Sequence, residues 1–312
     1  MIDLLDDAAP YPRDLVGYGR HAPDPRWPGG ARIAVNFVVN YEEGGESSIL
    51  HGDAVSEGFL GELPDSPPLA GRRDLGQESV YEYGSRAGFW RLHRLFTQRG
   101  VPVTVFAVGM ALARNPAAAR AMDRAGWEIA SHAWRWIDYA DMPPERERQF
   151  IARAVACHEA LLGHRPVGYY GSRISENTRR LVVEERGFLY DSDDYSDDLP
   201  FWNVEHGRPH LVIPYTLDTN DMRFASPAGF ENGESFERYL SDAFDYLYAE
   251  GATSPKLLTI GLHCRLTGRP GRAAGLARFI DRIVQLPEVW ICRRDQIARH
   301  WHATHPPKGH DA

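Results

Sequence analysis

Short apolar segments alternate along the chain with longer segments whose apolar residues recur at helical spacing. Residues 31–40 (ARIAVNFVVN), 101–109 (VPVTVFAVG) and 257–263 (LLTIGLH) are rich in β-branched and apolar residues, which is typical of buried strands. Residues 85–98 repeat apolar side chains at helical spacing, and Gly100 ends that pattern. The same reasoning predicts strands at 128–131, 167–170, 188–190, 210–215 and 289–292, and helices at 115–125, 143–162, 176–185, 235–250, 273–286 and 294–302. An alternation of about seven or eight strands with helices predicts an α/β domain with a parallel sheet, either closed as a barrel or doubly wound.

Two segments lack any such periodicity. Residues 1–30 contain prolines at positions 10, 12, 23, 25 and 28, which predicts an extended arm. Residues 45–78 are rich in Gly, Pro and Ser and are too long for an ordinary connection. We therefore expect one domain over 31–305, a short tail at 306–312, and a long loop that serves the site or reaches a neighbouring subunit of a homo-oligomer.

Composition narrows the class of partner. The chain has 312 residues, a net charge of -8 and 43% hydrophobic residues, which is typical of a globular protein and argues against nucleic-acid or anionic-membrane binding. No apolar run approaches the roughly 18 residues of a membrane span, and the acidic start has no signal-peptide pattern. Three widely scattered cysteines are expected to be reduced thiols. We expect a cytoplasmic protein that acts on a small molecule.

Polar side chains recur where the predicted strands end, and in α/β barrels that edge carries the chemistry. A lone histidine or a pair of acidic residues at one strand end is usually structural, but recurrence at successive ends favours a shared site. The residues at these positions are Glu42, Glu43, His132, Arg173, Asp191, Asp193, Asp194, Asn220, Asp221 and His263.

The order of these residues resembles that of the polysaccharide deacetylase superfamily, whose NodB-like fold is a distorted (β/α) barrel of about seven strands. The first family motif, Phe-Asp-Asp-Gly after a strand, is matched by residues 41–44 (YEEG). Arg173 matches the arginine of the third motif, and His263 matches the histidine of the last. The resemblance implies an Asp that acts with that histidine, and among Asp191, Asp193 and Asp194 the last fits best by position.

The second family motif is incomplete here. It contains two histidines four residues apart, but the chain has His132 followed by Trp136. In metal-using members those histidines and the second carboxylate of the first motif, here Glu43, hold a divalent ion. An indole has only an N–H donor and cannot be a ligand, whereas a catalytic zinc site needs three protein ligands. The sequence therefore predicts no metal and no other cofactor.

These departures resemble the metal-independent allantoinases of bacterial urate catabolism, a branch of the same superfamily. The likeness includes the runs NYEEGGE at 40–46, YEYGSR at 81–86, RWIDY at 135–139, PYTLDTNDMRF at 214–224 and GLHCR at 261–265. Residues 133–134 (AW) and 174–176 (ISE), which we expect beside the pocket, differ from that branch. Another cyclic ureide or imide therefore stays open as the substrate.

The resemblance implies a role for each residue in opening a ring such as that of allantoin to allantoate. Glu42 would be the general base and His263 the acid or oxyanion donor, with Asp194 keeping His263 protonated. Arg173 would either orient Glu42 or grip the ureido group. The pocket would be lined by Glu43, His132, Trp136 and Asn220. The alternatives are another C–N hydrolase, acting on a cyclic imide or an N-acetyl sugar, and a barrel that binds without catalysis.

Overall fold

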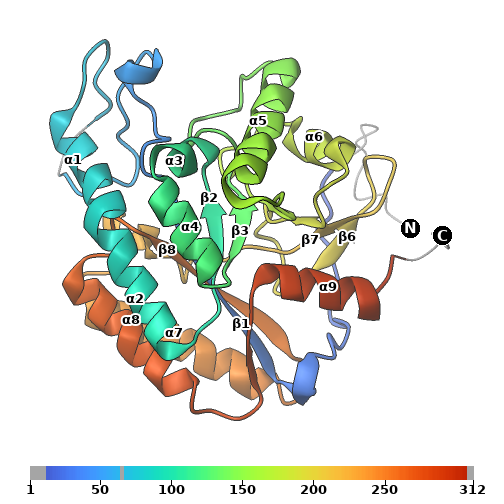
Figure 1. The fold of residues 1–312 in the computed structure, drawn as a ribbon. Coiled ribbons are helices and arrows are strands. Elements are labelled where there is room, and N and C mark those ends of the chain that lie inside the picture. The colour runs from blue at the N-terminus through green and yellow to red at the C-terminus, as the bar shows by residue number, and fades with distance from the viewer. Residues whose placement is uncertain (1–11, 64–66, 308–312) are drawn as a thin grey trace, which may run out of the picture.

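The computed structural model describes residues 12–63 and 67–307. In that part of the chain, one nine-stranded sheet has the order β6-β7-β5-β4-β3-β2-β1-β8, and β9 pairs with the start of β1 (Figure 1). The strands are β1 (Ile33–Tyr41), β2 (Thr104–Ala107), β3 (Glu128–Ser131), β4 (Gly168–Tyr169), β5 (Tyr190–Asp191), β6 (Phe201–Asn203), β7 (His210–Val212), β8 (Lys256–His263) and β9 (Val289–Ile291). All pairings are parallel except β6 with β7.

The sheet curls until its two ends approach each other. The main-chain N–H of Leu257 in β8 donates to the carbonyl of Asp198, just before β6, at 3.1 Å. Asn220, beyond β7, forms an isolated parallel bridge with Gly261 in β8. The result is an open, curled sheet in a single α/β domain, which confirms the predicted distorted barrel. The prediction omitted β6, because its three half-buried residues carry no apolar alternation.

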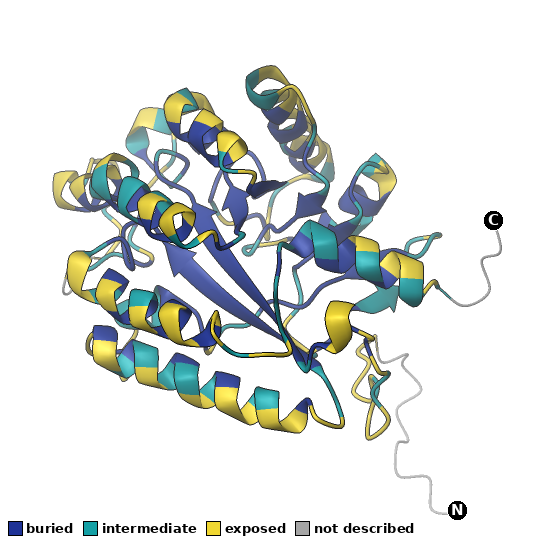
Figure 2. Ribbon diagram, turned by 60° about the horizontal axis from the view of Figure 1, so that its bottom comes forward, coloured by how far each residue is buried: buried dark blue, intermediate teal, exposed yellow. Residues whose placement is uncertain are grey.

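Helices cover the outside of the sheet, and their exposed residues face away from it (Figure 2). They are α1 (Leu75–Tyr83), α2 (Phe89–Arg99), α3 (Gly109–Arg114), α4 (Pro116–Arg124), α5 (Pro144–Leu162), α6 (Thr178–Glu185), α7 (Gly233–Glu250), α8 (Pro270–Ile283) and α9 (Arg294–Thr304). No described helix is long and apolar enough to cross a membrane. The three cysteines are free thiols.

The register of β1 against β8 places the site. Both strands are buried along their whole length, and β1 lies between β2 and β8. Asn40 pairs with His263, and Tyr41 pairs with Ala107. Parallel strands end at the same edge of the sheet, so Glu42, directly after β1, emerges beside His263.

The loop predicted over 45–78 is partly structured. It contains a 3-10 turn at Ile49–His51, and α1 begins before the predicted loop ends. A π-helical turn, Gly84–Gly88, then joins α1 to α2, so one nearly continuous helical segment replaces the shorter helix predicted at 85–98. A Cβ on Gly84 would overlap the Glu43 carboxylate, and one on Gly88 would overlap the carbonyl of Cys264. The two glycines therefore let this helical turn approach the site directly.

The described part of the N-terminal arm packs against its own chain. Trp27 is buried, and its indole N–H donates to the carbonyl of Lys256 at 3.1 Å. The Tyr18 hydroxyl donates to the carbonyl of Pro200 at 2.7 Å, and His300 of α9 contacts the carbonyl of Pro25 at 2.8 Å. Residues 1–11 of the predicted arm and 308–312 of the predicted tail lie outside the described residues.

Candidate active site

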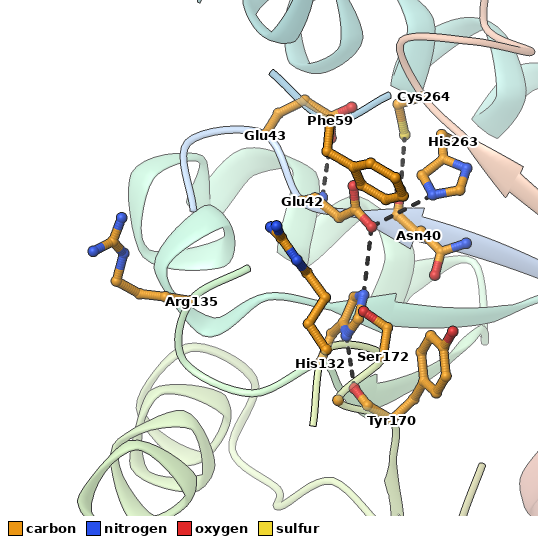
Figure 3. A network of polar contacts seen from close by, with 12 residues as sticks. Asn40, Glu42, Glu43, Phe59, His132, Arg135, Tyr170, Ser172, His263 and Cys264 are labelled. Atoms are coloured by element: carbon orange, nitrogen blue, oxygen red, sulfur yellow. Dashed lines mark hydrogen bonds and ion pairs between the residues drawn. The ribbon is translucent and has the colours of Figure 1, made fainter. Parts of the chain in front are cut away.

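Glu42 lies at the centre of a group of buried polar side chains at the carboxyl ends of β1, β3 and β8 (Figure 3). Its side chain is 1% exposed. Oε1 lies 3.4 Å from Nε2 of His132 and 3.5 Å from Nε2 of His263. Oε2 lies 2.8 Å from Nη1 of Arg265. Burial alone would raise the pKa of Glu42, but Arg265 and His263 hold that pKa well below its usual value. Glu42 is therefore a buried carboxylate that stays ionised.

His263 is held by Asp221 rather than by an aspartate near β5. Oδ1 of Asp221 lies 2.6 Å from Nδ1 of His263, and Oδ2 accepts the main-chain N–H of His263 at 2.7 Å. Burial lowers the pKa of His263, but Glu42 and Asp221 raise it more strongly, to about 9. The ring is thus an imidazolium at neutral pH, with its Nε2–H near Glu42 and available to a substrate.

His132 sits on the other side of Glu42. Its Nδ1 lies 2.6 Å from the carbonyl of Tyr170, and because a carbonyl only accepts, Nδ1 carries a proton. The ring stacks on Tyr170 with centroids 5.0 Å apart. Nε2 faces Oε1 of Glu42 at 3.4 Å and makes no closer hydrogen bond among the described residues. The ring is therefore fixed in place with Nε2 directed at the Glu42 carboxylate.

The structure adds Arg265, which the sequence reasoning left unassigned. The arginine is fully buried two residues after His263. Its Nη1 also lies 3.6 Å from Oε1 of Glu43, so one guanidinium serves two adjacent carboxylates. Burial raises the pKa of Glu43 to about 7. Arg265 lowers this pKa, but repulsion by the charge of Glu42 adds to the effect of burial, so the net shift is upward. Of the two carboxylates, Glu42 is the stronger acid and Glu43 the weaker.

Arg173 lies in the same region but does not orient Glu42. Its Nη1 contacts Oε2 of Glu57 at 3.5 Å. Its guanidinium lies 5.5 Å from the ring centre of Phe59 and 5.3 Å from that of Trp136. Among the described residues it is Arg265, not Arg173, that lies beside Glu42. The position of Arg173 is explained by the loop at 45–78, because Glu57 and Phe59 of that loop contact its guanidinium.

Two other predicted site residues are engaged elsewhere. Asp194 does not contact His263: its carboxylate lies 3.6 Å from Nη2 of Arg179 and accepts from Ser196. Asn220 is expected to bind substrate, but its Oδ1 accepts the N–H of Met222 and its Nδ2 lies 3.2 Å from the Tyr215 hydroxyl. Its amide caps the turn that carries Asp221, so it acts on the site through that turn.

The side chain of Trp134, in the segment at 133–134, packs against helices. Trp134 packs next to Gly109 of α3, and Arg153 of α5 lies over its ring at 4.0 Å. Ser175 donates to Glu147 of α5 at 2.6 Å. Trp134 and Ser175 therefore contact α3 and α5 rather than the catalytic groups.

The residues present do not fit a divalent metal centre. Trp136 stands where a second histidine would be needed, and its ring faces the guanidinium groups of Arg173 and Arg265. Arg265 already provides a cation to both Glu42 and Glu43. Across residues 12–63 and 67–307, no group of three or more His, Cys, Asp or Glu side chains is arranged to hold a metal ion.

Comparisons with known proteins show the family to which the chain belongs. The sequence profile of the family described as Polysaccharide deacetylase matches residues 79–187. A protein of Schizosaccharomyces pombe named for that family is 45% identical over 315 residues, which cover 95% of this chain and 98% of that protein. The chain belongs to the polysaccharide deacetylase family. It is accordingly a hydrolase of that superfamily.

Two crystal structures resemble this polysaccharide deacetylase family member over nearly its whole length. One, from Pseudomonas aeruginosa PAO1 and named for the same family, is 59% identical with a TM-score of 0.94, covering 96% of this chain and 100% of that one. The other, named Puue Allantoinase, is 58% identical with a TM-score of 0.94 and the same coverage. The NodB-like fold expected from the sequence is thereby confirmed.

Two residues of the site were visible in the sequence but not assigned. Asp221 is one of the polar residues that follow a predicted strand, and Arg265 lies in the run GLHCR at 261–265. Their roles depend on long-range pairings: Asp221 meets His263 from 42 positions away. Spacing along the chain gives no measure of such contacts.

Proposed function

We propose that the protein is a metal-independent amidohydrolase that opens a cyclic ureide, with allantoin, giving allantoate, as its substrate. The observation that carries the proposal is the pairing of an ionised carboxylate with an imidazolium, Oε1 of Glu42 and Nε2 of His263, 3.5 Å apart in a buried site. A base and an acid at that distance can act on the attacking water and on the leaving nitrogen of one substrate.

The proposed reaction begins when Oε1 of Glu42 takes a proton from a water molecule, whose oxygen attacks a ring carbonyl carbon. The carbonyl π bond becomes a tetrahedral oxyanion, which the cationic His263 stabilises. As the C–N bond breaks, Nε2 of His263 gives its proton to the leaving nitrogen. Glu42 then returns its proton to His263, which restores both groups, and the new carboxylic acid loses its own proton to solvent.

The cover over the site supports a small substrate. Glu57 contacts Arg173, Phe59 packs on Trp136 with ring centres 5.7 Å apart, and the carbonyl of Leu60 accepts from Nε of Arg265 at 3.4 Å. Residues 57–60 therefore lie over the catalytic groups, and the His263 side chain is 5% exposed. A compact ring suits such an enclosed site better than a polymer, which needs an open groove. The 58% identity to a structure named Puue Allantoinase supports the same substrate.

The test uses purified, chelator-treated protein with racemic allantoin, succinimide and N-acetylglucosamine oligomers. We expect ring opening of allantoin and much weaker activity on the other two. Preference for succinimide would make the protein a cyclic imide hydrolase, and preference for the oligomers would make it a sugar deacetylase. No turnover of any of the three, by a folded protein, would contradict the proposal.

A further inference from the structure

One buried arginine of the site, Arg265, is packed against two neighbouring aromatic rings, whose centres are 6.4 Å apart. The guanidinium carbon of Arg265 lies 4.3 Å from the ring centre of Tyr81 and 5.2 Å from that of Trp136. Its side chain is 0% exposed. Aromatic faces stabilise a cation and hold a planar guanidinium in one orientation. These contacts come from α1 and from the segment after β3, so two separate parts of the chain hold this one group in place.

The charges around Arg265 explain why a cation is needed there. Two adjacent carboxylates, Glu42 and Glu43, are both buried, and a buried charge without a partner is strongly destabilising. Nη1 of Arg265 is within 2.8 Å of Glu42 and 3.6 Å of Glu43. Nη2 has no hydrogen-bond partner among the described residues. Arg265 thus neutralises a carboxylate pair and retains donors for a ligand.

Arg265 also divides the two oxygens of Glu42 between two tasks. Oε2 faces Nη1 of Arg265, whereas Oε1 faces the two imidazoles. An oxygen held by an arginine is a poor proton acceptor, so the basic oxygen is the one directed at His132 and His263.

We propose that Arg265, packed against Trp136 and Tyr81, supplies the positive charge that a divalent cation would otherwise supply in this site, and positions Glu42 for catalysis. The inference rests on the proposed role of Glu42 as the base. It explains Trp136 as well. The indole stands where a metal-ligating histidine would be needed, and its ring packs against the Arg265 guanidinium. We therefore expect the position of the Arg265 guanidinium to depend on Trp136, and the absence of a metal at Trp136 to depend on Arg265.

The first test uses activity. Arg265→Lys keeps a positive charge but loses the planar fork, and we expect kcat to fall roughly 10- to 100-fold with KM changed less than about threefold. Arg265→Ala should lose more, and added guanidinium ion should restore part of its kcat. Glu42→Gln is the control, because guanidinium cannot restore a missing base. Circular dichroism melting of each variant establishes that it is folded. A rise in KM alone, or no rescue in a folded Arg265→Ala protein, would overturn the proposal.

The second test needs no substrate, so it separates this inference from the proposed function. Trp136→His restores the second histidine, yet we expect it to bind little zinc because Arg265 still holds both carboxylates. The double variant Trp136→His/Arg265→Ala should bind close to one zinc per chain, measured by elemental analysis after dialysis. Equal zinc binding by the single and the double variant would contradict the proposal, as would no zinc in either. If wild type hydrolyses none of the tested substrates, the proposed function fails and this measurement still decides the role of Arg265.

Discussion

Asp221 holds His263 through both of its carboxylate oxygens, one on Nδ1 at 2.6 Å and the other on the main-chain N–H at 2.7 Å. The second oxygen also accepts the N–H of Thr267 at 3.1 Å. The aspartate is fully buried and cannot relax toward solvent. It fixes the proton on Nδ1, directs Nε2 toward Glu42, and contributes to the raised pKa of His263.

We predict that Asp221→Asn lowers the pKa of His263 from about 9. In the proposed mechanism the imidazolium is the active form, so activity falls when the pH rises through the pKa of His263. This fall is the alkaline limb of the pH profile, and a lower pKa moves it to lower pH. The limb in the pH profile of kcat measures this directly, and kcat at neutral pH should fall roughly 10²–10⁴-fold. Asp194→Asn is the matched control and should leave the limb in place, because Asp194 contacts Arg179 instead. An unmoved limb in Asp221→Asn would show that Asp221 does not tune His263.

Arg173→Lys should raise KM about 3- to 30-fold and leave kcat largely unchanged. We expect an effect on substrate binding rather than on Glu42, because in the described part of the chain the Arg173 guanidinium contacts Glu57 and two aromatic rings and makes no contact with Glu42. A lysine keeps the charge but cannot stack on both rings. Steady-state kinetics with allantoin separates the two constants. A fall in kcat at unchanged KM would return the orienting role to Arg173.

Activity should survive EDTA, and elemental analysis should find well under one zinc per chain. The physical reason is that Trp136 cannot ligate and Arg265 already pairs with the two carboxylates. Stoichiometric, tightly bound zinc together with loss of activity in chelator would contradict the proposed chemistry.

The periodic parts of the fold were predictable and the irregular parts were not. β1, β3 and β8 agree with the sequence pattern to within two residues at either end, because fully buried strands are nearly uniformly apolar. The helix predicted at 85–98 includes most of the turn at Gly84–Gly88, but its π geometry was not predicted, and its glycines are explained by the approach to Glu43 and Cys264. β6 was not predicted because it is defined by its hydrogen bonds to β7, which its own three residues do not indicate.

The site shows the same division. Residues that directly end a buried strand, Glu42 and His263, could be placed together from the parallel topology alone. Their partners could not, because Asp221 and Arg265 gain their roles from curling of the sheet and from a loop that closes over it. Family position suggested Asp194 and Arg173 instead, and both side chains are engaged by other charges.

We propose that the protein forms a homo-oligomer, with a tetramer as the expected state. Leu15 and Val16 of the arm are 73% and 78% exposed, an apolar pair that a neighbouring subunit could cover. The described residues 18–30 cover their own chain, so the contact would involve the start of the arm or the outer surface of the loop at 45–78. Light scattering that returns the 35.2 kDa monomer at micromolar concentration would refute this.

The most direct test of the central claim, that Glu42 is the base of a metal-free ring opening, compares Glu42→Gln with wild type on allantoin in chelator-treated buffer. The substitution keeps the size of the side chain and removes the proton acceptor, so kcat should fall roughly 10²–10⁴-fold while the thermal unfolding midpoint stays close to that of wild type. Glu184→Gln, at an exposed position of α6, serves as the matched carboxylate control and should keep full activity. Near wild-type turnover by a folded Glu42→Gln protein would contradict the account.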